Sequence, residues 1–181
     1  SLKLSVEGKL NEIEGFTLPN PRDYPFYGVI FDLPLALLET ILKVSKPQNY
    51  FLLRHFFTFS IFFVSALYLH KILNNRFKKK IIIFFGVLLY ISSPRIFADS
   101  FYNNKDLVFL SFLTISLFYY FKLIDNFDYK NILNFSFFSA LACALRIIGI
   151  FLPITFLFFI FLSNKKIDKN YHLVKKILLF I

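Results

Sequence analysis

"SPRIFADSFYNNKD", residues 93–106, is a polar segment between two strongly apolar ones. The chain before it reads IIIFFGVLLYI over residues 81–91, and the chain after it reads LVFLSFLTISLFYYF over residues 107–121. Apolar runs of this kind predict membrane-spanning helices, because crossing the hydrocarbon core takes roughly 20 predominantly apolar residues. The polar segment therefore predicts a loop that joins two membrane spans at one surface.

The composition predicts an all-α, polytopic membrane protein. Hydrophobic residues make up 57% of the 181 positions, whereas a soluble domain averages about 45–50%, and the excess lies in long runs. The net charge of +10 is typical of cytoplasmic loops in such a protein, so we expect no nucleic-acid partner. Cys143 is the single cysteine, which argues against a disulfide framework and a cysteine-based metal cluster.

Residues 1–48 predict a first outer loop followed by an interfacial helix. The opening of the chain is polar and contains several prolines, as expected of a water-exposed loop. Segment 28–44 has a helical apolar pattern that Asp32, Pro34 and Glu39 interrupt. Such a segment is too polar to span, so we expect an amphipathic helix at the membrane surface.

Residues 49–181 predict the transmembrane bundle. The predicted spans cover residues 51–70, 81–97, 107–123, 131–145 and 147–163, and a sixth begins near residue 177. The chain starts at Ser1 rather than methionine and stops inside an apolar run. We therefore expect a fragment that lacks both ends.

The distribution of basic residues predicts the orientation. Loops 71–80 and 164–176 carry five Lys or Arg each, and both lie on one side together with loop 122–130 if the spans alternate. Basic loops are usually cytoplasmic. Segment 93–106 and the turn at Arg146 are then expected at the outer face.

The polar segment has two interpretations. Its polar members are Arg95, Asp99, Asn103, Asn104, Lys105 and Asp106. They fit a solvated hairpin loop equally well by position alone. However, Lys105 and Asp106 lie where a helix begins, and a cation beside a helix N-terminus can hold a phosphate. Asp106 could instead cap its own helix.

Three further residues are candidates for the same surface. Arg54 and His55 lie near the outer end of the first predicted span. Arg54 either reaches the lipid head groups or pairs with a phosphate or a carboxylate of the first loop. Arg146 lies in an apolar stretch without a charged neighbour in sequence. Its expected partner is an anion, either a lipid phosphate or Asp106.

The sequence contains no motif of soluble nucleotide or metal chemistry. Walker, GxGxxG, HExxH and G-x-S-x-G patterns are missing. The histidines His55, His70 and His172 are too scattered to predict a metal site. We expect no cofactor, although a divalent cation remains compatible with the sequence.

Several segments together resemble a known family. They are YPFYGVIFDLPLALLE (24–39), LRHFFTFSIFFVSALYLHKIL (53–73), the segment from Ser93 to Phe121, and SALACALRIIGIFLPI (139–154). Their order resembles glycosyltransferase family 39 and its protein O-mannosyltransferase-like relatives of the GT-C superfamily. The resemblance covers residues 24–163, and the S-P-R…N-x-K-D and R-I-x-G patterns carry most of it.

The resemblance implies a sugar donor carried on polyprenyl phosphate. It also implies a catalytic carboxylate in the first outer loop, at a position upstream of Ser1, and an acidic residue of the second outer loop at Asp106. Basic residues of such sites hold the lipid phosphate, which indicates Lys105, Arg54 and Arg146, and also Arg95. We expect the polar neighbours of these residues to line the same site, namely His55, Asn103 and Asn104.

This chemistry suits a site at the membrane surface. The polyprenyl tail stays among the membrane lipids while its phosphate lies at the surface. Arg and Lys would stabilise the charge that develops on the leaving phosphate, and a carboxylate would deprotonate the acceptor hydroxyl. The bias toward Phe, Ile, Lys and Asn resembles AT-rich genomes, so we expect a multi-pass protein of a bacterial inner membrane.

Two other functions remain open at this stage. A transporter or flippase would place polar residues or helix breaks near the bilayer centre, whereas here the charges gather at span ends. A non-catalytic membrane subunit would use segment 93–106 only as a loop. Substitution of Asp106 or Arg146 would then leave the activity of its complex close to normal.

Overall fold

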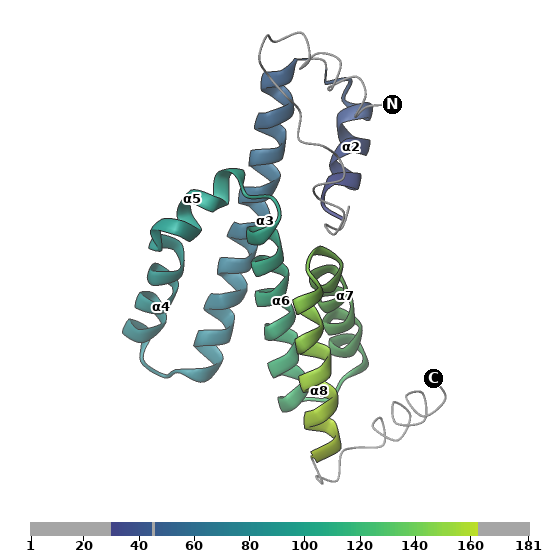
Figure 1. The fold of residues 1–181 in the computed structure, drawn as a ribbon. Helices are drawn as coiled ribbons and strands as arrows, with labels where there is room; N and C mark the ends of the chain where they lie inside the picture. Colours follow the sequence, from purple (N-terminus) through teal and green to yellow (C-terminus); the bar gives the residue numbers. More distant parts are fainter. Residues whose placement is uncertain (1–29, 45, 163–181) are drawn as a thin grey trace, which may run out of the picture.

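The computed structural model describes residues 30–44 and 46–162, and every regular element among them is a helix (Figure 1). The elements are α2 (Asp32–Ile41), α3 (Pro47–Arg76), α4 (Lys80–Ser92), α5 (Pro94–Tyr102), α6 (Asp106–Asp125), α7 (Tyr129–Leu145), the 3-10 helix η2 (Ile147–Ile150) and α8 (Phe151–Leu162). The predicted all-α fold is thereby confirmed. The predicted loop at the start of the chain and the sixth predicted span lie outside the described residues.

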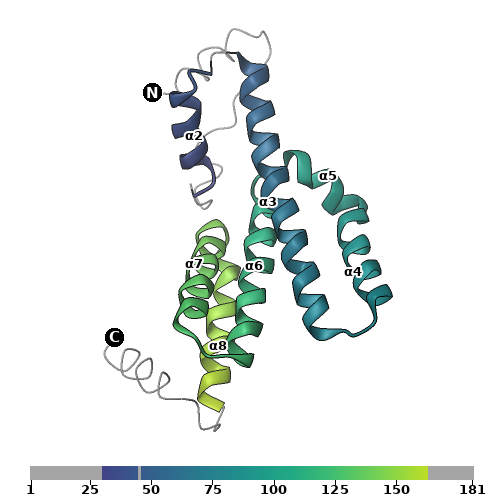
Figure 2. The same cartoon turned by 180° about the vertical axis from the view of Figure 1, so that it is seen from behind.

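Helix α3 is the central element. In Figures 1 and 2, α4 runs back along one side of α3, and α6, α7 and α8 lie on the other side. Helix α2 lies beside the first half of α3, at the end where α3 and α6 begin and α7 ends. We call this end the α2 end. The opposite end, with loops 77–79 and 126–128, we call the basic end. Segment 93–106 and Arg146 therefore share one end, as the alternation of spans predicts.

Helix α2 forms in spite of the proline inside it. Pro34 is the third residue of the helix, where no intrahelical bond to its nitrogen is needed. At the other end, Lys43 adopts a left-handed conformation with φ 48°. The N–H groups of Lys43 and Val44 then donate to the carbonyls of Thr40 and Glu39, at 3.3 and 3.1 Å. These two bonds form a Schellman motif, which turns the chain toward α3.

The second predicted span contains a bend. Helix α4 ends at Ser92, and α5 continues from Pro94 with a bend of 56°. A proline ring disfavours helical conformation in the residue before it, and Ser93 before Pro94 has an extended ψ of 118°. Helix α4 thus ends five residues before the predicted boundary at residue 97, and the chain continues through the bend into α5.

The lengths of the helices identify the candidate membrane spans. Residues Gln48–Arg76 of α3 and helix α6 are each long and apolar enough to cross a bilayer, and the bent pair α4–α5 makes a third if it acts as one span. Helix α7 has 17 residues, a length of about 25 Å. The apolar segment from Ile147 to Ile160 is shorter still. The fourth and fifth spans therefore stay predictions.

Helix α2 is packed onto the bundle by an apolar cluster. Phe31 and Leu35 are buried with Val108 of α6 and Leu145 of α7, and partly buried residues of α3 such as Phe57 pack against them. This packing positions the α2 carboxylates Asp32 and Glu39 beside Arg54 of α3. Small hydroxyl residues contribute to the buried side of α6, as is common where membrane helices approach closely; they are Ser111, Thr114 and Ser116.

Candidate functional site at the α2 end

Side chains from four places in the sequence meet at the α2 end. They come from α2, from the third turn of α3, from the loop between α5 and α6, and from the turn after α7. They form two ion-paired groups. The first is centred on Arg54, and the second joins Asp106 to Arg146.

Arg54 holds α2 against α3. Its Nη1 lies 2.6 Å from Asp32 Oδ1, and its Nε lies 3.0 Å from Glu39 Oε1. The Glu39 side chain is only 3% exposed and that of Arg54 is 17% exposed. The guanidinium also lies over the ring of Tyr50, with 4.4 Å between Cζ and the ring centroid. A buried carboxylate needs a cation and hydrogen bonds, and Arg54 supplies both to Glu39.

Two consecutive asparagines connect the ion-paired groups. Asn104 Nδ2 lies 3.4 Å from Asp32 Oδ1, and Asn103 Nδ2 lies 3.4 Å from Asp106 Oδ2. Asn103 Oδ1 also accepts the backbone N–H groups of Lys105, at 3.2 Å, and Asp106, at 2.9 Å. Asn103 therefore satisfies the backbone N–H groups at the start of α6. This leaves the Asp106 carboxylate available to Arg146.

The ion pair between Arg146 Nη2 and Asp106 Oδ1 is the accessible part of the cluster. Its side chains are 40% and 45% exposed, in contrast to the Arg54–Glu39 pair. Arg146 is held by its backbone, because Gly149 donates its N–H to the Arg146 carbonyl at 2.9 Å. A Cβ on Gly149 would lie 2.7 Å from the backbone nitrogen of Cys143. The R-I-x-G pattern thus positions the arginine by close contact of the turn with α7.

The remaining predicted residues differ in their exposure and contacts. Lys105 is half-buried at the start of α6, between Asn104 and Asp106. His55 is exposed on α3. The Arg95 side chain is 87% exposed and pairs with Asp99 at 3.7 Å, one turn further along α5. The structure thus brings Arg54, both asparagines, Asp106 and Arg146 together, and leaves Arg95 on the outer surface of α5.

Sequence reasoning missed the role of Glu39. It treated this residue as an interruption of an apolar pattern, whereas Glu39 is one of the partners of Arg54. The signal was present, because Asp32 and Glu39 are seven residues apart and so lie on one face of a helix. The sequence analysis likewise names Asp32 only as an interruption of that pattern.

The ion pairs of the cluster join two arginines, Arg54 and Arg146, to three carboxylates, Asp32, Glu39 and Asp106. An anion that binds at this surface must therefore compete with carboxylates for the arginines. An anion can compete most easily at the half-exposed Asp106–Arg146 pair, because separating these two side chains does not leave a buried charge without a partner. Within the described ranges, no group of three His, Cys, Asp or Glu residues is placed to hold a metal ion.

The apolar helices indicate an integral membrane protein, and the ion-paired polar cluster lies at their ends. Residues 36–181 match the family described as dolichyl-phosphate-mannose-protein mannosyltransferase. The chain therefore belongs to this family of membrane glycosyltransferases, as the resemblance predicts. No curated protein and no solved structure matches it. Family membership favours the glycosyltransferase over the transporter and the subunit.

Proposed function

We propose that the protein transfers a sugar from a polyprenyl-phosphate donor to an acceptor hydroxyl, at the outer face of the membrane. The observation that carries this proposal is the half-exposed Asp106–Arg146 pair at the ends of apolar helices, in a chain of this family. The donor, the face and the residue roles go beyond the family assignment.

The position of the pair suits a lipid-linked donor. Asp106 is the first residue of α6, a candidate membrane span. A residue at the end of a span lies near the level of the lipid head groups. A polyprenyl tail can then remain in the bilayer while its phosphate reaches the half-exposed guanidinium of Arg146.

Asp106 and Arg146 have different roles in the proposed transfer. As the acceptor oxygen attacks the anomeric carbon, a carboxylate takes the acceptor's proton, and the bond from that carbon to the phosphate oxygen breaks. The products are the glycosylated acceptor and polyprenyl phosphate. Among the described carboxylates we assign a direct part to Asp106. A guanidinium has five N–H donors, enough for Arg146 to contact both Asp106 and the leaving phosphate.

The other cations take different roles in this proposal. Lys105 adds positive charge beside the phosphate. Arg54 is a positioning residue, because its contacts with Asp32 and Glu39 hold α2 next to the loop that carries Asn104. The basic end, with Lys78, Lys79 and Lys80, faces the cytoplasm by the positive-inside rule. The α2 end then faces outward, and in a bacterium that is the periplasmic side of the inner membrane.

The test is transfer by the full protein in membranes, with a panel of radiolabelled polyprenyl-phosphate sugars. We expect Asp106→Asn and Arg146→Ala each to lower the rate by about 100-fold or more. Asp125→Asn is the matched control, because this carboxylate is exposed at the opposite end of the same helix. Its rate should stay within about two-fold of the unaltered protein, at equal protein level.

Other results would contradict separate parts of the proposal. Transfer unaffected by both substitutions would leave the enzyme class in place and remove the site assignment. No transfer from any donor by a folded protein would remove the polyprenyl-phosphate donor. We expect transfer to continue in EDTA. A loss that Mg²⁺ reverses would show that a divalent cation is needed.

A further inference from the structure

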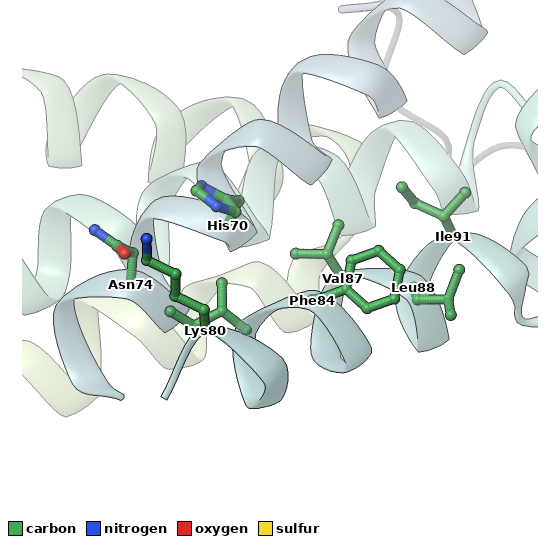
Figure 3. A pocket seen from close by; sticks show the side chains of 8 residues that line it. His70, Asn74, Lys80, Phe84, Val87, Leu88 and Ile91 are labelled. Atoms are coloured by element: carbon green, nitrogen blue, oxygen red, sulfur yellow. The ribbon is translucent and has the colours of Figure 1, made fainter. Parts of the chain in front are cut away.

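A second feature lies on the side of α3 that faces α4, away from the cluster at the α2 end. It is a hollow of about 400 Å³ between the last part of α3 and α4 (Figure 3). Polar residues of its lining are His70 and Asn74 of α3 and Lys80 of α4. The rest of the lining is apolar and comes from α4. None of these residues has a part in the proposed sugar transfer.

The apolar part of the hollow follows one face of α4. Lys80, Phe84, Leu88 and Ile91 succeed one another at spacings of four, four and three residues, so they form a single stripe. The stripe runs roughly 16 Å along the helix axis, at a rise of 1.5 Å per residue. One leaflet contributes about half of the 30 Å hydrocarbon core. The stripe therefore has the length of one leaflet.

The polar part of the hollow lies at its basic end. Figure 3 shows His70, Asn74 and Lys80 grouped at one end, with Val87, Leu88 and Ile91 toward the other. Ammonium, amide and imidazole groups can all donate hydrogen bonds. In the described part of the chain, no carboxylate forms an ion pair with Lys80. Segment 71–80 adds four more basic residues and contains no acidic one.

We propose that this groove binds one anionic phospholipid of the leaflet at the basic end. Its phosphate lies at Lys80, Asn74 and His70, and one acyl chain lies along the stripe on α4. A zwitterionic choline lipid fits less well, because its quaternary ammonium would meet this cationic surface without a carboxylate to balance it. The bound chain fills space that protein side chains leave open, and so supports the packing of α4 on α3.

A polyprenyl phosphate is the competing occupant, and two features disfavour it. The groove is about one leaflet long, whereas an isoprenoid donor chain is longer. The polar residues of the groove also lie at the end opposite Asp106 and Arg146. The proposal therefore stands or falls independently of the proposed sugar transfer.

The test is native mass spectrometry of the detergent-purified full protein, titrated with phosphatidylglycerol or with phosphatidylcholine of the same acyl chains. We expect phosphatidylglycerol to bind at least five-fold more tightly. Lys80→Ala should weaken phosphatidylglycerol about five-fold, the usual effect of one basic residue on an anionic lipid, and should leave phosphatidylcholine unchanged. Leu88→Trp, which narrows the groove without changing its charge, should weaken both lipids.

The matched controls lie outside the groove. Lys130→Ala removes an exposed lysine at the same end, and Leu133→Trp enlarges an exposed apolar residue of α7; both should bind like the unaltered protein. Equal binding of the two lipids would overturn the proposal. So would an equal loss in Lys80→Ala and Lys130→Ala, which indicates attraction to the whole surface. Tighter binding of polyprenyl phosphate with the same dependence on Lys80 would assign the groove to an isoprenoid instead.

Discussion

Arg54 and Arg146 meet carboxylates at the same end of the molecule, but their surroundings give them different tasks. The Arg54–Glu39 pair is buried, whereas Arg146 and Asp106 are both nearly half exposed. Removing a buried cation leaves a buried anion without compensation. Removing an exposed one leaves an anion that water can solvate. Loss of Arg54 should therefore act on stability, and loss of Arg146 on catalysis.

The stability of Arg54→Ala measures the first of these effects. We expect a loss of about 3 kcal/mol, because Glu39 stays buried without its partner. Thermal melting in detergent checks this value. Adding Glu39→Gln to Arg54→Ala should recover part of the loss, since the uncompensated charge is then gone.

The control for Arg54→Ala is Arg76→Ala on the same helix. Arg76 is exposed, and its guanidinium lies over the ring of Phe121 with 4.4 Å from Cζ to the centroid. An exposed contact of this kind contributes about 0.5–1 kcal/mol. Equal melting temperatures for Arg54→Ala and Arg76→Ala would contradict a structural role for the buried pair.

At the scale of an element, the turn formed by η2 decides where Arg146 lies. Gly149 is pressed against the backbone of α7, while Gly86 of α4 faces only the side chain of Leu73. An added methyl group would lie 2.7 Å from the nearest atom at either glycine. A side chain can rotate away, but backbone atoms of a helix cannot move without breaking its packing.

Gly149→Ala should therefore reduce sugar transfer far more than Gly86→Ala. We expect a loss of about 10-fold or more for Gly149→Ala, since a shift of about 1 Å in a catalytic group can cost that much or more. Gly86→Ala should stay within about two-fold. The comparison uses initial transfer rates at equal amounts of folded protein. Similar rates for the two variants would show that the turn does not position Arg146.

The elements also show what could be predicted from the sequence. The apolar runs predicted helices α3 and α6, and the residue pattern offered Asp106 as a partner of Arg146. The end of α4 was predicted five residues late, although Pro94 was visible and restricts the residue before it. The seven-residue spacing places Asp32 and Glu39 on one face of a helix, but it does not show that this face meets Arg54, because the contact depends on how α2 folds back on α3 through the turn at Lys43.

At the scale of the whole molecule, the two ends differ in chemistry. The α2 end carries a polar cluster in which arginines pair with carboxylates, and the basic end carries consecutive lysines. The alternation of basic and polar loops was predictable from the sequence. The number of spans was less predictable, because α7 and α8 are short and only their packing against other parts could fix their depth in a bilayer.

The orientation can be tested with single cysteines. Replacing Cys143 by serine gives a background to which Tyr102→Cys at the α2 end or Lys79→Cys at the basic end is added; both positions are exposed. In intact cells, we expect a membrane-impermeant maleimide to label the Tyr102→Cys variant alone, and to label both variants after lysis. Labelling of both variants in intact cells would contradict the proposed orientation.

The pair of amides at positions 103 and 104 has a mechanical consequence. Each amide reaches a carboxylate on a different element, Asp106 on α6 and Asp32 on α2, and each contact is 3.4 Å long. Contacts of that length are near the limit of a hydrogen bond, so these two hydrogen bonds are weak. Asn103 Oδ1 is held more firmly, by the backbone N–H groups of Lys105 and Asp106. The loop between α5 and α6 is therefore anchored on α6, while the Asn104 contact that joins it to Asp32 of α2 is easily broken.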